Sequence, residues 1–444
     1  MGKRTFDYSL IMPRVKQSEM ADLFVQQAPK SLAVLPFYVA AAIFFLGWTI
    51  LLFISSAELT GHHFNPHILA IVHAIVLGWG TMIIFGAVYQ LLPVLCEHDL
   101  YSCKLAFISF VTLLIGTIIL VYCFWKFQIG TLLIIAGSIV VLSAFCYLYN
   151  VCATIIGSTK TTRYRYFMIS SAIWLLLTTT AGLLLAINLS HNFIPRDHID
   201  LLKLHAHAGI VGWFLQLICG VGAKLIPMFL LGKTKKDYLL HTALALQNTG
   251  LVLFIVHAYF KQIDAIALIY IILIIVGTLL WGRYIWEAIK SRIRKKTDLL
   301  MKQAIYSLCI KLLAVTALGI TFMSSHTKWV SLYGTLVFLG WITGIIISKT
   351  FKTLPFIVWN NHYKDVHGNA RIPLPKNLYS EKLVKLQTHL FVVALVLLCI
   401  ALIFNQVWLL RLATALWVAL ASLYCFNVGK VVFHQSKVKP WRSH

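Results

Sequence analysis

The stretch HAGIVGWFLQLICGVGAKLIP, residues 207–227, is apolar over most of its length and decides the class of fold. A helix needs about 20 mostly apolar residues to cross the hydrocarbon core of a bilayer. Runs of this length recur from Ser31 almost to the C-terminus, and 60% of the 444 residues are apolar against 12% charged. The sequence therefore predicts an all-α, polytopic membrane protein.

We expect twelve transmembrane helices, at residues 31–55, 66–93, 104–124, 128–156, 165–189, 200–231, 238–259, 264–286, 303–325, 329–350, 383–404 and 407–428. They divide the chain into a cytoplasmic N-terminal arm (1–30), a membrane domain (31–428) and a basic cytoplasmic tail (429–444). The arm is polar and the first span is too long for the apolar part of a signal peptide, so we expect no cleavable signal.

The net charge of +24 follows the expected topology and does not indicate a nucleic-acid partner. If the N-terminus is cytoplasmic, thirty of the 38 Lys and Arg residues fall in the arm, the inner loops, the tail or the inner ends of spans, four lie in outer loops and four lie elsewhere in spans. Such an excess of basic residues is typical of the cytoplasmic side of membrane proteins. The sequence thus predicts a multi-pass plasma-membrane protein with both termini inside, in contact with the lipid bilayer.

An internal repeat organises the spans. HAIVLGWGTMIIFGAVYQLLP, from His73, matches the opening stretch in its His, then Gly five residues on, Trp at six, Gly at thirteen and Pro at twenty. A third copy, from Thr335, keeps Gly340, Trp341 and Pro355 but has Ser348 for the second glycine. The copies lie in spans 2, 6 and 10, four spans apart. We therefore expect three pseudo-symmetric arcs of four helices each.

Histidines gather in the outer half of the expected membrane domain. His67 and His73 lie on span 2, His205 and His207 on span 6, and His257 near the outer end of span 7. An ionisable residue within a span is costly and indicates function. Neutral imidazole is a common metal ligand and a usual axial ligand of haem. The alternative for each of them is a hydrogen bond to a neighbouring helix.

His205 and His207 are two residues apart, which places them about 200° apart around a helix. They are poorly placed to share one metal. The pair suits two adjacent sites on opposite sides of the helix, or one site and one structural histidine.

Taken together, the twelve spans, the three arcs and these histidines resemble subunit I of the haem-copper oxidases. The stretch LHAHAGIVGW, from Leu204, is similar to span 10 of the C-type cytochrome c oxidases and nitric oxide reductases, but here it lies on span 6. By span, the resemblance implies copper ligands at His207 and His257, and a low-spin haem ligand at His73, with His67 as the alternative.

The resemblance breaks at span 10, which supplies haem ligands in the family but here has Tyr333 and Thr335. A conventional oxygen-reducing centre is therefore not expected. A b-type haem clamped by His73 and His207 remains a hypothesis, with His205 and His257 left for copper or a gas molecule.

The predicted function is electron transfer or the handling of oxygen or nitric oxide, with a cytochrome c or another membrane subunit as partner. Since all fourteen Asp and Glu residues lie in loops, tails or span ends, a carboxylate proton relay through the core is disfavoured. The rival hypothesis is a non-enzymatic relative, either an assembly partner of a respiratory complex or a transporter using Gln216, Gln247 and Asn248.

Overall fold

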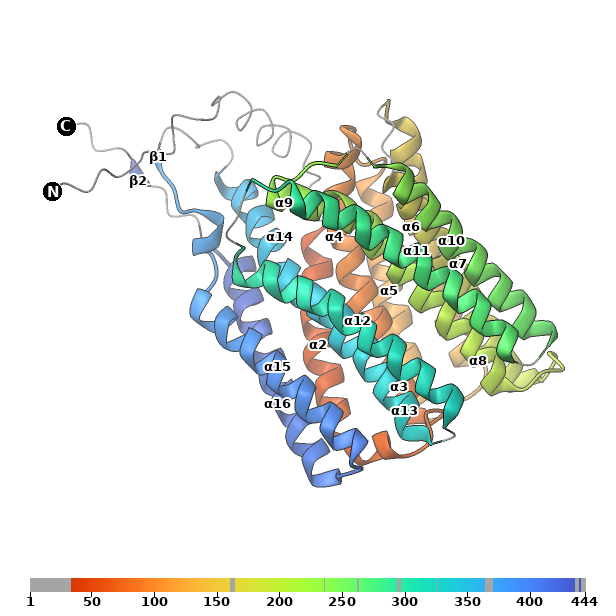
Figure 1. The fold of residues 1–444 in the computed structure, drawn as a ribbon. Helices are drawn as coiled ribbons and strands as arrows, with labels where there is room; N and C mark the ends of the chain where they lie inside the picture. Colours follow the sequence, from red (N-terminus) through yellow and green to blue (C-terminus); the bar gives the residue numbers. More distant parts are fainter. Residues whose placement is uncertain are drawn as a thin grey trace.

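A computed structural model describes residues 33–159, 164–234, 236–261, 263–293, 297–324, 326–363, 370–435 and 439–440. Within them are twelve helical segments long and apolar enough to cross a membrane, and consecutive segments run antiparallel (Figure 1). The remaining regular structure is two short 3₁₀ turns and a two-residue antiparallel pairing of β1 (Ala370–Arg371) with β2 (Lys439–Pro440). The expected all-α, twelve-span architecture is confirmed. The arm at 1–30 lies outside the described residues.

Nine spans are single α-helices and three are composite. The single ones are α2 (Leu35–Ile54), α5 (Cys103–Trp125), α6 (Thr131–Gly157), α7 (Tyr164–His191), α10 (Tyr238–Phe260), α11 (Ala265–Lys290), α12 (Leu299–Met323), α15 (Glu381–Ile403) and α16 (Val407–Val432). The composite ones are α3–η4–α4 (Pro66–Cys96), α8–η5–α9 (His198–Leu230) and α13–η6–α14 (Thr327–Tyr363).

The three composite spans form the centre of the molecule. Two thirds of the residues in the most apolar window of each are buried, against 17% to 50% in the other nine spans. We call them the inner helices, and each is the second helix of its arc. The sequence repeat that predicted the arcs therefore marks the helices with the largest buried fraction.

Small residues on the inner helices receive large side chains from the first helix of the same arc. A Cβ added at Gly78 would lie 2.3 Å from the Phe44 ring, and one at Gly212 would lie 2.4 Å from the Trp174 indole. In the third arc, a Cβ at Gly340 would lie 2.7 Å from Ile310. Close approach of helices at small residues is the usual way that membrane helices pack.

The indoles of the repeat join one arc to another. Trp213 Nε1 donates a hydrogen bond to Thr81 Oγ1 at 3.0 Å, and Trp79 Nε1 donates one to Thr343 Oγ1 at 3.1 Å. Each threonine follows the tryptophan of its own helix by two residues. At that position the inner helix of the second arc has Leu215. Trp341 accordingly has a buried Nε1 with no partner among the described residues.

The largest difference from the predicted spans lies in the third arc. The span expected to end at residue 350 continues to Tyr363, through Pro355. Proline inside a helix removes one backbone hydrogen bond and ordinarily ends or kinks it. Here the following turns are held by packing, since Ile357, Val358 and Tyr363 are all buried. In the other two arcs a left-handed residue ends the helix four positions after the proline, at Glu97 and Leu231.

The two ends of the bundle differ in chemistry. Helices α2, α5, α7, α10, α12 and α15 begin at the end that carries most of the Lys and Arg side chains outside the spans, which we call the basic end. His62, His63, His67 and His198 lie at the opposite end, which we call the histidine end.

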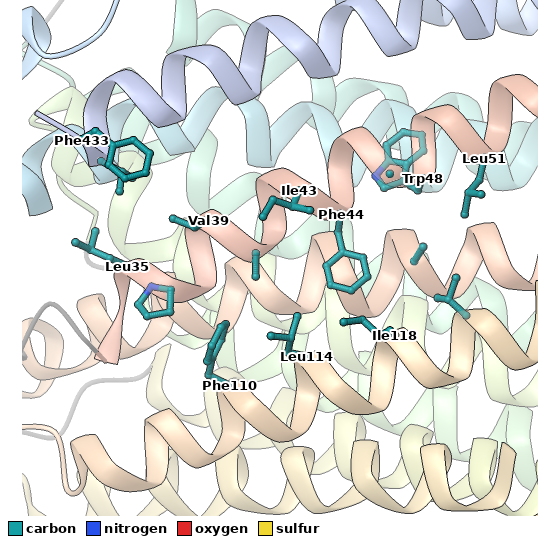
Figure 2. A pocket seen from close by; sticks show the side chains of 16 residues that line it. Leu35, Val39, Ile43, Phe44, Trp48, Leu51, Phe110, Leu114, Ile118 and Phe433 are labelled. Carbon is teal, nitrogen blue, oxygen red and sulfur yellow. The ribbon is translucent and has the colours of Figure 1, made fainter. Parts of the chain in front are cut away.

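An apolar groove of about 780 Å³ runs along the outside of α2 (Figure 2). Val39, Ile43 and Phe44 of α2 line it, facing Leu114 and Ile118 of α5. None of the described residues that line this groove is charged. In a membrane such a surface lies against lipid acyl chains.

Candidate functional site

Each inner helix changes its winding next to the repeat position. The α-helices α3 (Pro66–His73) and α8 (His198–His207) end on the repeated histidine. Wider π-helical segments follow at once, η4 (Ala74–Thr81) and η5 (Ala208–Leu215). The third arc has η6 (Thr335–Thr343), which starts at the residue that replaces the histidine. Short π-helical segments inside α-helices are frequent at functional sites.

Side-chain caps fix where the two histidine-bearing helices begin. The Asn65 side chain accepts hydrogen bonds from the backbone N–H groups of His67 and Ile68, and Pro66 follows at the first helical position. The Asp197 side chain accepts bonds from Ile199 and Asp200 in the same way. These caps satisfy the first backbone N–H groups of the helices that carry His73 and His205.

The structure brings the rings of His73 and His205 close together across the junction between the first and second arcs. Their ring centroids are 6.4 Å apart and the ring planes differ by 20°. The Nδ1 atom of His73 lies 2.7 Å from the Leu69 carbonyl oxygen, and that of His205 lies 3.1 Å from the Thr178 carbonyl oxygen. A carbonyl only accepts, so each Nδ1 carries the proton. Each Nε2 is then left with a lone pair.

This geometry fits a single metal ion held by both rings. Two imidazoles on opposite sides of a metal, each about 2.0–2.1 Å from it, hold their centroids roughly 6–6.5 Å apart. Metal-binding histidines also commonly donate their other N–H to a carbonyl, as these two do. The centroid distance and the Nδ1 contacts are those expected if both rings were to hold one metal ion through Nε2.

Neighbouring residues hold the two rings in place. A Cβ added at Gly182 of α7 would lie 2.9 Å from His205 Cε1, so only glycine leaves room for this ring position. Phe124 of α5 stacks on His73, with centroids 4.7 Å apart. One ring of the pair is thus supported by the first arc and the other by the second.

His207 points to a different junction. Its Nδ1 lies 2.8 Å from the Lys203 carbonyl oxygen, and its ring lies nearly parallel to Tyr333 of α13 (Thr327–Gly334), with centroids 6.1 Å apart. Phe254 of α10 packs beside it, with centroids 5.5 Å apart. The two histidines of the His-x-His pair therefore serve two junctions, as helix geometry predicts. The sequence hypothesis placed His207 opposite His73, whereas the structure has His205 there.

The other two predicted ligands lie in ion-pair positions near the histidine end. His67 Nδ1 is 2.6 Å from Glu58 Oε1, and its ring packs on Trp125. His257 Nε2 is 3.1 Å from Asp264 Oδ1. Burial raises the pKa of Asp264, but hydrogen bonds from the Ile266 N–H and His257 outweigh it and lower the pKa below its ordinary value.

Copper ligation by His207 and His257 stays a prediction. In the described part of the chain, no three His, Cys, Asp or Glu side chains group closely enough to suggest a metal site. A site held by two histidines has fewer ligands than the three that define such a group.

The polar side chains that a transport path would use are bonded between helices. Asn248 Oδ1 accepts hydrogen bonds from Trp174 Nε1 at 2.7 Å and Gln216 Nε2 at 3.2 Å. Ser170 donates to Gln216 at 2.6 Å. Gln247 Nε2 contacts Cys219 Sγ and Thr278 Oγ1. These contacts favour a role in helix packing.

No family model matches the sequence, and no curated protein matches it. The site therefore rests on its own geometry.

Sequence reasoning missed the supports of the histidine pair. The carbonyl of Thr178 and the space at Gly182 belong to α7, which carries no repeat signature around these positions. Sequence reasoning could have found the threonines that accept hydrogen bonds from the indole N–H groups, because both stand two residues after the repeated tryptophan.

Proposed function

We propose that this membrane protein binds haem between His73 and His205 and uses it for electron transfer or for handling a small gas such as oxygen or nitric oxide. The observation that supports the proposal is the near-parallel ring pair at 6.4 Å, in which each Nδ1 lies within hydrogen-bond distance of a backbone carbonyl oxygen. The resemblance to oxidase subunit I agrees with a haem between inner helices of neighbouring arcs.

A b-type haem would supply a one-electron carrier whose potential depends on its axial ligands. In this chain His73 and His205 would hold the iron, while the carbonyls of Leu69 and Thr178 would fix the tautomer and tilt of the rings. If both histidines held the iron, this site would suit electron transfer better than gas binding. His207 and His257 remain the candidates for copper or a gas.

The charge distribution supports an orientation with the basic end and both termini in the cytoplasm of a bacterial cell. The histidine pair would then lie in the outer half of the plasma membrane. An electron donor such as a cytochrome c or another membrane subunit would approach from the histidine end. Reporter fusions at the C-terminus test this orientation, since a reporter active only outside the cytoplasm should stay inactive there.

The decisive experiment is an optical spectrum of the purified protein together with iron and copper analysis. We expect a Soret band and one haem per chain. His73→Ala and His205→Ala should each abolish the six-coordinate spectrum, whereas His207→Ala should retain it, because its ring faces Tyr333.

His241→Ala serves as a matched control, since His241 lies near the basic end, at the start of α10. A colourless, metal-free protein would contradict the proposal and favour the non-enzymatic rival. Haem loss in His207→Ala with retention in His205→Ala would favour the clamp that the sequence first suggested.

A further inference from the structure

The first helix of the third arc carries a polar stripe, whose counterparts in the other two arcs are apolar except for Ser171. Gln303, Ser307 and Lys311 lie four residues apart on α12 and therefore share one face. Since Ile310 of α12 packs on its inner-helix glycine as Phe44 and Trp174 do, the three first helices can be aligned. The stripe then corresponds to buried residues of α2 and α7, namely Phe37, Ala41, Phe45, Phe167, Ser171 and Leu175.

The part of the stripe nearest the basic end is buried, and several of its polar atoms have no hydrogen-bond partner among the described residues. Gln303 Oε1 accepts a hydrogen bond from Thr388 at 3.0 Å, but Gln303 Nε2 has no partner among the described residues. Ser307 Oγ is buried and equally unpartnered there, as are both polar atoms of Gln387 on α15. Ser171, the counterpart of Ser307, donates to the Met168 carbonyl at 2.9 Å. Buried polar groups in native proteins are nearly always hydrogen-bonded, to water where protein offers nothing.

Lys311 ends the stripe at the middle of α12. It is twelve residues from either end of the helix (Leu299–Met323), which is about 18 Å at 1.5 Å per residue. A lysine side chain cannot reach the interface from that depth. Its Nζ lies 5.7 Å from the Trp281 ring centroid and 5.8 Å from that of Trp341.

The titratable groups near Lys311 are two thiols, Cys219 on α9 (Gln216–Leu230) and Cys309 on α12 itself. In the described residues no carboxylate pairs with it. A charged Lys311 would need water as its solvent at this depth, with the two indole faces as partial support.

We propose that the stripe lines a water-filled path from the basic end to Lys311, which gives protons from that side access to the centre of the membrane. Its entrance lies where Lys352 pairs with Asp298 and Lys349 Nζ packs 3.7 Å from Met301 Sδ. The path ends at Lys311, against Trp281 and Trp341. It stands independently of haem binding, because none of its residues touches the histidine pair.

Cysteine accessibility tests the path with a matched control. In vesicles of known orientation, Ser307→Cys should react with a charged methanethiosulfonate added at the basic end at least tenfold faster than Ser171→Cys. Both serines are fully buried and hold equivalent positions in their arcs. Mass spectrometry of the labelled peptides separates them from the native cysteines. Adding Lys311→Met should slow the labelling of Ser307→Cys severalfold, because the ammonium group retains the water.

Equal labelling of the two variants, or labelling of Ser307→Cys only from the histidine end, would overturn the proposal. Hydroxyl-radical footprinting of the unaltered protein gives a second test that needs no variant. Trp341 should be oxidised severalfold faster than Trp79 and Trp213, although all three are at most 2% exposed. Equally slow oxidation of all three would show that the path is dry.

Discussion

At the scale of single residues, the inner helices depend on having no side chain at a few positions. A Cβ at Gly212 would overlap the Trp174 indole at 2.4 Å, whereas one at Gly47 would meet nothing within 4 Å. Overpacking a well-packed site costs about 1–3 kcal/mol. We therefore expect Gly212→Ala to lower the midpoint of thermal unfolding in detergent by several degrees.

Gly47→Ala is the matched control for this change. It should leave the midpoint unchanged or raise it slightly, since alanine favours the helix by up to ~1 kcal/mol. An equal loss in both variants would mean that the glycine contact does not limit stability.

His63, in the loop that precedes α3, should make stability depend on pH. Burial lowers the pKa of His63, with further contributions from His62 and Lys203, so the folded protein favours the neutral ring. The unfolded chain then binds the proton more readily below about pH 6.5. The contribution of His63 to the free energy of unfolding is therefore complete above that pH. It decreases as the pH drops toward the pKa of His63 in the folded protein.

His63→Gln should therefore reduce the decrease in the unfolding midpoint between pH 7.5 and pH 5. A decrease as steep as that of the unaltered protein would assign the effect to other groups.

At the scale of elements, the π-helical segments set the direction of the histidines. A π turn holds about one residue more than an α turn. Inserting an alanine after Ile210 adds a residue that η5, already widened, has no further turn to absorb, and should rotate α8 by about 100° relative to α9. His205 would then leave His73, and the haem absorption expected from the pair should be lost while the protein remains folded.

A matched insertion of an alanine after Leu336 within η6 should leave the absorption intact, because the third arc contributes nothing to the histidine pair. Loss of absorption in both insertion variants, with equal loss of folded protein, would assign the effect to general damage.

Element boundaries show where sequence reasoning works for this chain. Apolar length located every span, because hydrocarbon thickness fixes it. The same reasoning ended span 10 at residue 350, since Pro355 ordinarily stops a helix, and missed the tertiary packing that carries α14 (Gly344–Tyr363) past it. The π-helical segments have no composition of their own and were not predictable.

At the scale of the whole molecule, two of the three arc junctions of the inner helices have an indole–threonine bond. A double-mutant cycle of Trp213→Phe with Thr81→Val should give a coupling energy of about 0.6 kcal/mol, and at most about 1.7 kcal/mol. The equivalent cycle of Trp341→Phe with Leu215→Val should give about zero, because no bond joins them. Similar coupling in the two cycles would contradict the asymmetry of the ring.

The candidate site also belongs to this scale. The sequence identified His73, His205 and His207 as the residues to examine, and helix geometry separated the last two. Which of them faces His73 depends on how the second arc sits beside the first. That placement is decided by packing at Gly182 and Gly212 of different helices, which no local pattern encodes.

The glycine contacts also have a consequence for how the chain is made. Phe44 with Gly78 and Trp174 with Gly212 join neighbouring helices that leave the ribosome in quick succession. The indole–threonine bonds join residues 132 and 264 positions apart. Contacts between near neighbours in the chain form with little loss of entropy, whereas distant ones wait for the later segment. Each arc can therefore assemble in the membrane during synthesis, and the bond from Trp79 to Thr343 forms only after the tenth span has been inserted.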